Sequence, residues 1–117
     1  MQLVDLLDRI NITGEDSEQI AARKAALAAI IMASKRVQEE AIPSVLSSSE
    51  AAELPANYVL QEIEKFRLLC MKLGTEKVKE EFWNLHSQGL FEIRFDESGE
   101  YIHLSEKFRS EIVVNYL

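Results

Sequence analysis

Residues 75–106 read TEKVKEEFWNLHSQGLFEIRFDESGEYIHLSE, and the hydrophobic period of the chain changes at Gly89 within this stretch. Before the glycine, the apolar residues have the spacing of one helix face: Val78, Phe82 and Leu85. This spacing predicts a helix over 76–88, with Thr75 as its N-cap and Gly89 as its stop. After the glycine, apolar and polar residues alternate, which is typical of strands.

The alternating residues predict a β-hairpin, because Asp96-Glu97-Ser98-Gly99 between the two strands has turn chemistry. Pairing Phe95 with Glu100 places the apolar residues on one face, with Ile93 opposite Ile102 and Phe91 opposite Leu104. The other face then pairs Arg94 with Tyr101 and Glu92 with His103.

The rest of the chain is predicted to be helical. A short amphipathic helix is expected over 2–10, and a longer one starts at the N-cap Ser17 and ends near Ala41, before Pro43. Seven alanines lie between positions 21 and 33, and such small side chains allow the close approach of another helix, either within the chain or across a homodimer through residues 17–41. Further helices are expected over 57–73 and from Glu106, after the cap Ser105, to the end.

The composition of residues 43–56, with two prolines and four serines, predicts a linker. We therefore expect an N-terminal helical extension over 1–42, the linker over 43–56 and a second unit over 57–117. The fold class is mainly α with one β-hairpin, in which a winged-helix-like domain follows an N-terminal helical pair.

This second unit resembles the winged helix-turn-helix superfamily. Its residues Val78, Phe82, Leu85, Gly89 and Leu90, then Phe91-Glu92-Ile93-Arg94, the turn, and Leu104-Ser105-Glu106-Lys107, are similar to the pattern of regulators of the multiple-antibiotic-resistance type. The resemblance covers residues 57–117, about half of the chain. It implies that exposed residues at the start of the 76–88 helix would read DNA bases and that the hairpin would be the wing.

The charge of the chain argues against a generic polyanion binder, because 20 acidic and 13 basic side chains give a net charge of −7. Residues 75–89 hold two lysines against three glutamates, and residues 90–104 hold one arginine against four acidic residues. Duplex DNA would be repelled by such a surface. A dimeric winged-helix transcriptional regulator is the alternative reading, and its DNA-binding residues would be Thr75, Lys77, Lys79 and Arg94.

The first reading is a non-enzymatic adaptor that docks onto a larger protein with a basic surface. Trp83 lies beside the core position Phe82, and tryptophan is enriched among residues that dominate interfaces. The expected interaction residues are Lys79, Trp83 and His86 on the helix and Asp96, Glu97 and Glu100 at the wing. By analogy with acidic winged helices of this size, the larger partner is expected to belong to an ATPase complex that acts on DNA.

Several classes of site are not expected. The single cysteine, Cys70, cannot form an intramolecular disulfide, and the two histidines lack metal-motif spacing. The sequence contains no phosphate-binding loop, nucleophile elbow or paired catalytic residues, so we expect no enzyme, cofactor, metal or small-molecule ligand. A cytoplasmic location is expected, with no membrane partner, because neither a secretory signal nor a membrane-spanning stretch is visible.

Overall fold

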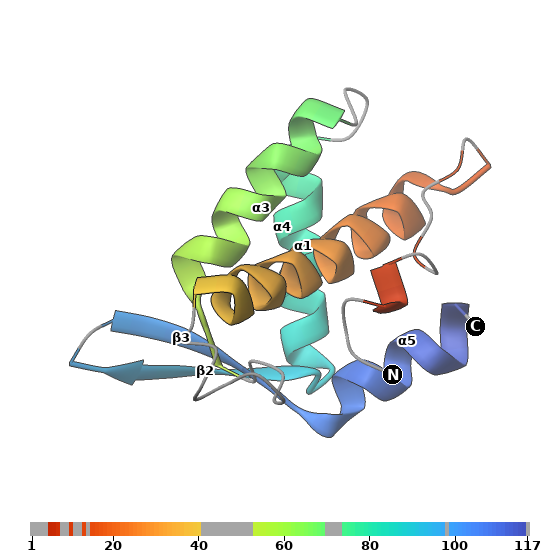
Figure 1. Cartoon of the computed structure of the whole chain (residues 1–117). Helices are drawn as coiled ribbons and strands as arrows, with labels where there is room; N and C mark the ends of the chain where they lie inside the picture. Colours follow the sequence, from red (N-terminus) through yellow and green to blue (C-terminus); the bar gives the residue numbers. More distant parts are fainter. Residues whose placement is uncertain are drawn as a thin grey trace.

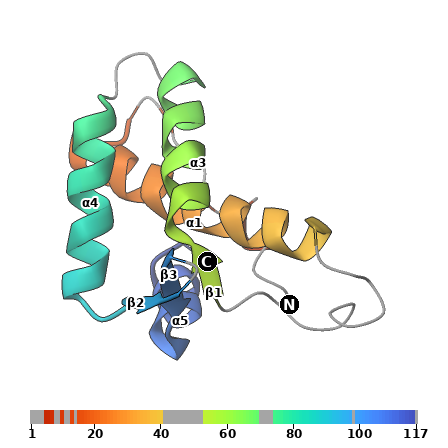
Figure 2. The same cartoon turned by 90° about the vertical axis from the view of Figure 1, so that its left-hand side faces the viewer.

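The computed structural model describes residues 5–7, 10, 13, 15–40, 53–69, 74–97 and 99–116, and for 66–69, 75, 115 and 116 it describes the backbone alone. The elements in this part of the chain follow in the order α1 (Glu18–Glu40), β1 (Glu53–Pro55), α3 (Ala56–Leu69), α4 (Thr75–Ser87), β2 (Phe91–Asp96), β3 (Gly99–Leu104) and α5 (Glu106–Tyr116). Figure 1 shows the hairpin β2–β3 projecting from one side of a helical body. In Figure 2, α3 and α4 lie next to each other with α1 crossing them. The fold is mostly helical with a small antiparallel sheet.

Helix α1 lies at the centre of the hydrophobic core. Its residues from Ala25 to Ile31 are all buried, so the helix is covered on every side over about two turns. It packs mainly on α3 and α4 (Figures 1 and 2). Leu6 and Ile10 join the same cluster, with residues 5–7 forming one 3₁₀ turn, while the other residues of the helix expected over 2–10 lie outside the described part of the chain.

The alanines of α1 pack against other elements of the same chain. All seven are at most 8% exposed, and the cluster that holds six of them, all but Ala28, also contains residues of α3, α4, β1, β2, β3 and α5. One core therefore includes residues from both sides of the 43–56 stretch. A homodimer through residues 17–41 stays a prediction, and in this fold the alanine face is already occupied by the chain's own elements.

The start of α1 agrees with the sequence prediction. The Ser17 hydroxyl accepts a hydrogen bond from the backbone N–H of Ile20 at 3.2 Å, as an N-cap does. Just before it, the Asp16 carboxylate accepts bonds from the Lys24 ammonium at 2.9 Å and the Thr13 N–H at 3.0 Å. These bonds, that of Lys24 above all, hold the pKa of Asp16 below its ordinary value of 3.8.

A polar network joins the second half of α1 to α3. The Arg36 guanidinium lies 4.0 Å from the centre of the Tyr58 ring and 3.4 Å from the carboxylate of Glu62, which is 2% exposed. Lys65 adds a second positive charge 3.0 Å from that carboxylate, so the buried anion is paired. The Tyr58 hydroxyl donates to Glu40, and this bond raises the pKa of Tyr58.

The sheet has three strands where the sequence predicts two. Glu53–Pro55, assigned to the linker, form β1 and pair antiparallel with β3, giving the order β1-β3-β2. Leu54 is fully buried and lies opposite Ile102. The linker prediction for 53–55 was therefore wrong, because one buried leucine next to Pro55 carries no strand period that a sequence pattern can register.

Helix α4 begins one residue earlier than predicted. Gly74 occupies the N-cap position and Thr75 is the first helical residue, so Thr75 is not the cap. At the other end the prediction is confirmed: Gly89 has φ = +82°, and Leu90 N–H donates to the Leu85 carbonyl while Gly89 N–H donates to that of His86. These two bonds form a Schellman motif, which requires a left-handed residue at Gly89.

The hairpin register is confirmed at every position predicted. Phe91 pairs with Leu104, Ile93 with Ile102 and Phe95 with Glu100, while Arg94 faces Tyr101 and Glu92 faces His103. Ser105 then closes the base of the hairpin in an unexpected way. Its hydroxyl lies within hydrogen-bond distance of the carbonyls of Gly89 and Leu90, and its N–H donates to Leu90. The predicted side-chain cap on α5 is replaced by this link to the end of α4.

Candidate functional site

Two of the three predicted interaction residues of α4, Trp83 and His86, form part of an aromatic chain that leads into the hairpin. Trp83 is 51% exposed, and its ring meets the rings of Phe82 at 5.4 Å and His86 at 6.0 Å edge to face. His86 in turn lies 5.4 Å from the ring of Phe91 on β2. The buried rings thus fix the exposed tryptophan beside the base of the hairpin.

The same face of β2 continues to an exposed tip. Phe91, Ile93 and Phe95 lie on one side of the strand because side chains alternate, and their exposure rises from 1% at Phe91 to 76% at Phe95. Ile93, between them, is half-buried. The apolar face predicted for the hairpin is therefore correct in register, but the core covers only its inner end.

Acidic side chains gather at the tip of the hairpin that carries this exposed phenylalanine. Asp96, Glu97 and Glu100 are all exposed, and Asp96 Oδ1 accepts the Gly99 N–H at 3.1 Å, which shapes the turn. We call Trp83, His86, Ile93, Phe95, Glu97 and Glu100 together the α4–hairpin surface. It combines aromatic area with negative charge. Five of the six predicted interaction residues lie on it or directly beside it, and the sixth, Lys79, is half-buried one turn before Trp83.

The residues predicted for DNA binding are not assembled into a cationic surface. Arg94 lies on the opposite face of the hairpin from Phe95, where Glu53 (3.5 Å) and Glu92 (3.3 Å) both pair with it. Lys77 pairs with Glu80 at 3.9 Å, and Lys77 and Lys79 point to different sides of α4 because they are two residues apart. The Thr75 side chain lies outside the described part of the structure.

Two features of this region were not foreseen from the sequence. Glu81 is 3% exposed and accepts a hydrogen bond from the Asn84 side chain at 3.2 Å, whereas its neighbour Glu80 is exposed. A pair of adjacent glutamates looks like a solvated face, and only the packing of α4 separates the two. The second feature is the exposure of Phe95, whose one sequence signal is that its strand partner is Glu100 instead of an apolar residue.

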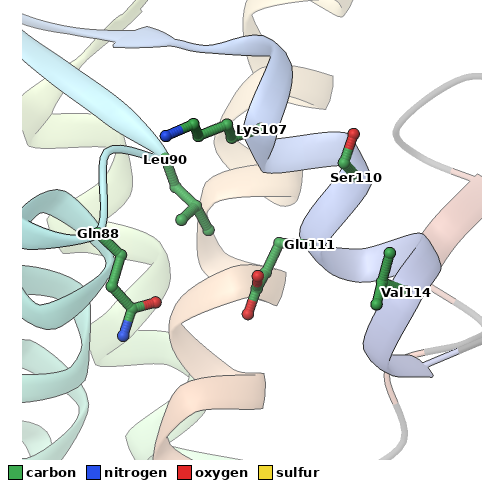
Figure 3. A pocket seen from close by; sticks show the side chains of 6 residues that line it. All are labelled: Gln88, Leu90, Lys107, Ser110, Glu111 and Val114. Atoms are coloured by element: carbon green, nitrogen blue, oxygen red, sulfur yellow. The ribbon is translucent and has the colours of Figure 1, made fainter.

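A separate hollow of about 240 Å³ lies between the α4–β2 turn and α5. Figure 3 shows Gln88 and Leu90 on one side of it, and Lys107, Ser110, Glu111 and Val114 on α5. Arg23 of α1 reaches both Gln88, at 2.8 Å, and Glu111. Two polar groups of the hollow, those of Gln88 and Glu111, are thus engaged in joining α1 to the end of α4 and to α5, which is a structural role.

Two further features of the described residues concern metal ions and membranes. No three histidine, cysteine or acidic side chains there are arranged to hold a metal ion. None of the helices in that part of the chain has both the length and the apolar content that crossing a bilayer requires. Comparison of the sequence and the structure with protein-family models, curated proteins and solved structures gives no match.

Proposed function

We propose that this protein is a winged-helix adaptor that docks onto a basic surface of a larger protein through the α4–hairpin surface. The element order helix, strand, helix, helix, hairpin and helix, with sheet order β1-β3-β2, supports the winged-helix assignment. In that assignment α4 is the third helix of the motif and β2–β3 is the wing.

The observation that carries the docking proposal is the exposure of two aromatic side chains, Trp83 beside the base of the hairpin and Phe95 at its acidic tip. Exposed aromatic residues on a rigid frame are the usual anchors of protein interfaces, and surrounding acids select a positively charged partner. The polyanion DNA fits poorly, because Arg94 and Lys77 are already paired with carboxylates. A subunit of an ATPase complex that acts on DNA is a partner of the expected kind.

The test starts from the partner, identified by affinity purification from the source cells and then purified for reconstitution. In measurements of the dissociation constant, Trp83→Ala and the double variant Glu97→Lys/Glu100→Lys each weaken the complex by about tenfold or more. The matched double variant Glu15→Lys/Glu39→Lys makes the same change of charge away from α4 and the hairpin and leaves affinity within about twofold.

A mobility-shift assay with duplex DNA tests the alternative, a DNA-binding regulator. The adaptor proposal expects no retardation at physiological salt. Retardation that falls steeply with salt and disappears in Lys79→Ala would establish a DNA-binding regulator instead.

A further inference from the structure

The two edges of the three-stranded sheet differ in their capacity to accept another strand. Strand β3 is central, so β1 and β2 are the edge strands. An edge strand presents unpaired backbone N–H and C=O groups, and proteins usually blunt such edges with short strands or proline. Strand β1 has three residues and includes Pro55, whereas β2 has six residues, no proline and an uninterrupted register with β3.

Pro55 also determines which residues of β2 point outward. Pro55 lies opposite Tyr101 and has no N–H, so the hydrogen-bonded pair of β1 and β3 is the neighbouring one, Leu54 with Ile102. The backbone groups of Ile102 therefore turn toward β1, and those of Tyr101 and His103 turn toward β2. Their partners Arg94 and Glu92 bond inward.

The outward set on β2 is then Phe91, Ile93 and Phe95. Within the described residues no strand lies beyond β2, and no backbone hydrogen bond outside the ladder involves Ile93 or Phe95. The residues with outward backbone groups are the same ones whose side chains form the apolar face that ends in the exposed Phe95. Backbone donors, backbone acceptors and apolar contact area thus coincide along one strand.

We propose that the β2 edge binds an extended segment of the partner as an added strand, with apolar side chains on the Phe95 face and basic side chains on the opposite face. This inference rests on the proposed docking function and specifies its mode. Added strands gain affinity from main-chain hydrogen bonds and specificity from alternate side chains.

The charged side chains of β2 indicate which kind of segment would bind along its edge. On the face opposite Phe95, β2 carries Glu92 and Asp96, while Arg94 between them is held by Glu53 and Glu92. Lysine or arginine on a neighbouring strand would form opposite-charge cross-strand pairs with these acids. A second copy of this chain carries the same net charge of −7, which opposes its approach.

The test uses the full chain and a fluorescent ten-residue peptide of alternating valine and lysine. In the free protein, hydrogen exchange measured by NMR is faster at the amides of Ile93 and Phe95 than at those of Glu92 and Arg94, by about tenfold or more. Saturating peptide slows exchange at Ile93 and Phe95 by about tenfold or more and leaves Glu92 and Arg94 little changed.

Two variants separate the contribution of the Ile93 backbone N–H to peptide binding from that of its side chain. Ile93→Pro removes the outward N–H without removing a ladder bond, and we expect it to weaken peptide binding at least about tenfold more than Ile93→Ala, which removes side-chain contact but keeps the N–H. A peptide in which glutamate replaces lysine binds at least about tenfold more weakly than the lysine peptide. Should Ile93→Pro fail to fold, the exchange measurement on the unaltered chain decides alone.

Contrary outcomes separate this inference from the proposed function. No peptide binding up to about 1 mM, or binding without protection at Ile93 and Phe95, overturns strand addition. The adaptor proposal is then judged by the reconstituted partner and its response to Trp83→Ala. Equal binding of the glutamate peptide overturns the basic-segment assignment. Concentration-dependent dimers with protection at Ile93 and Phe95 in the absence of peptide assign the edge to a second copy instead.

Discussion

The base and the tip of the hairpin carry the same residue type in two environments. Phe91 at the base is 1% exposed, with its ring 4.8 Å from that of Phe82, whereas Phe95, four residues along the same strand face, is 76% exposed. The alternation that builds a core-facing strand thus continues past the point where the helices stop covering it. An apolar face therefore serves folding at one end and is available for binding at the other.

The largest expected effect is a loss of stability on substitution at the base of the hairpin, while the same substitution at the tip has little effect. Phe91→Ala removes a buried ring from the core and lowers the free energy of unfolding by about 3–5 kcal/mol. Phe95→Ala removes the same atoms from solvent and costs less than about 1 kcal/mol. Urea unfolding followed by circular dichroism measures both. Equal losses in the two variants would mean that Phe95 is covered in solution.

A second pair compares facing isoleucines on the two strands. Ile102 is 1% exposed on the central strand, and its partner Ile93 is half-buried on the edge strand. Ile102→Ala is expected to cost about 2–4 kcal/mol, and Ile93→Ala about half as much because part of its surface already meets water. The comparison is sharpened by the same urea titrations, and a larger loss at Ile93 would contradict the edge position of β2.

The two glycines with positive φ, one at the base and one at the tip of the hairpin, give a smaller difference in stability. Gly89 (φ = +82°) ends α4 at the base, and Gly99 (φ = +138°) follows the turn at the tip. Gly89→Ala strains the junction of α4 and β2 and lowers global stability by about 1–2 kcal/mol. Gly99→Ala strains the turn alone, so we expect faster hydrogen exchange near the tip with a global change below about 1 kcal/mol. A larger global loss at Gly99 would show that the tip and the core unfold together.

The smallest expected effect is on the pH dependence of the melting temperature, and it does not involve the hairpin. Because bonding to Lys24 lowers the folded-state pKa of Asp16 below 3.8, Asp16 stabilises the fold above its ordinary pKa, and this contribution is lost as the pH falls through the lower folded-state value. Asp16→Asn should reduce the acid sensitivity of the melting temperature in that range. Hairpin exchange rates should not change, and unchanged acid sensitivity in the variant would exclude the role of Asp16.

The sequence predicts most of what depends on local period and turn chemistry. The α1 cap at Ser17, the left-handed Gly89 and the full β2–β3 register are all confirmed, because each follows from residues close in the chain. What it misses depends on contacts between distant segments. Strand β1 forms through the burial of Leu54 against Ile102, and Ser105 bonds to carbonyls fifteen and sixteen residues earlier.

For the candidate site, sequence reasoning identified Trp83 and the acidic tip but not the exposed edge. The hydrophobic pattern assigns Phe95 to the apolar face without showing how far the helices extend over it. It also cannot show that α1, through its alanines, lies in the centre of the core, because a helix with small residues suits an internal packing and a dimer equally well.

The proline at the far side of the sheet limits the size of any assembly built on β2. A sheet can keep growing by edge-to-edge addition of subunits only if each subunit has two edge strands that can pair with another strand. Pro55 leaves the β1 side with one backbone N–H fewer on a strand of only three residues. Among the sheet edges of the described residues, β2 alone is then suited to adding a strand, so the proposed binding at β2 would end in a closed complex and would not propagate into a fibre.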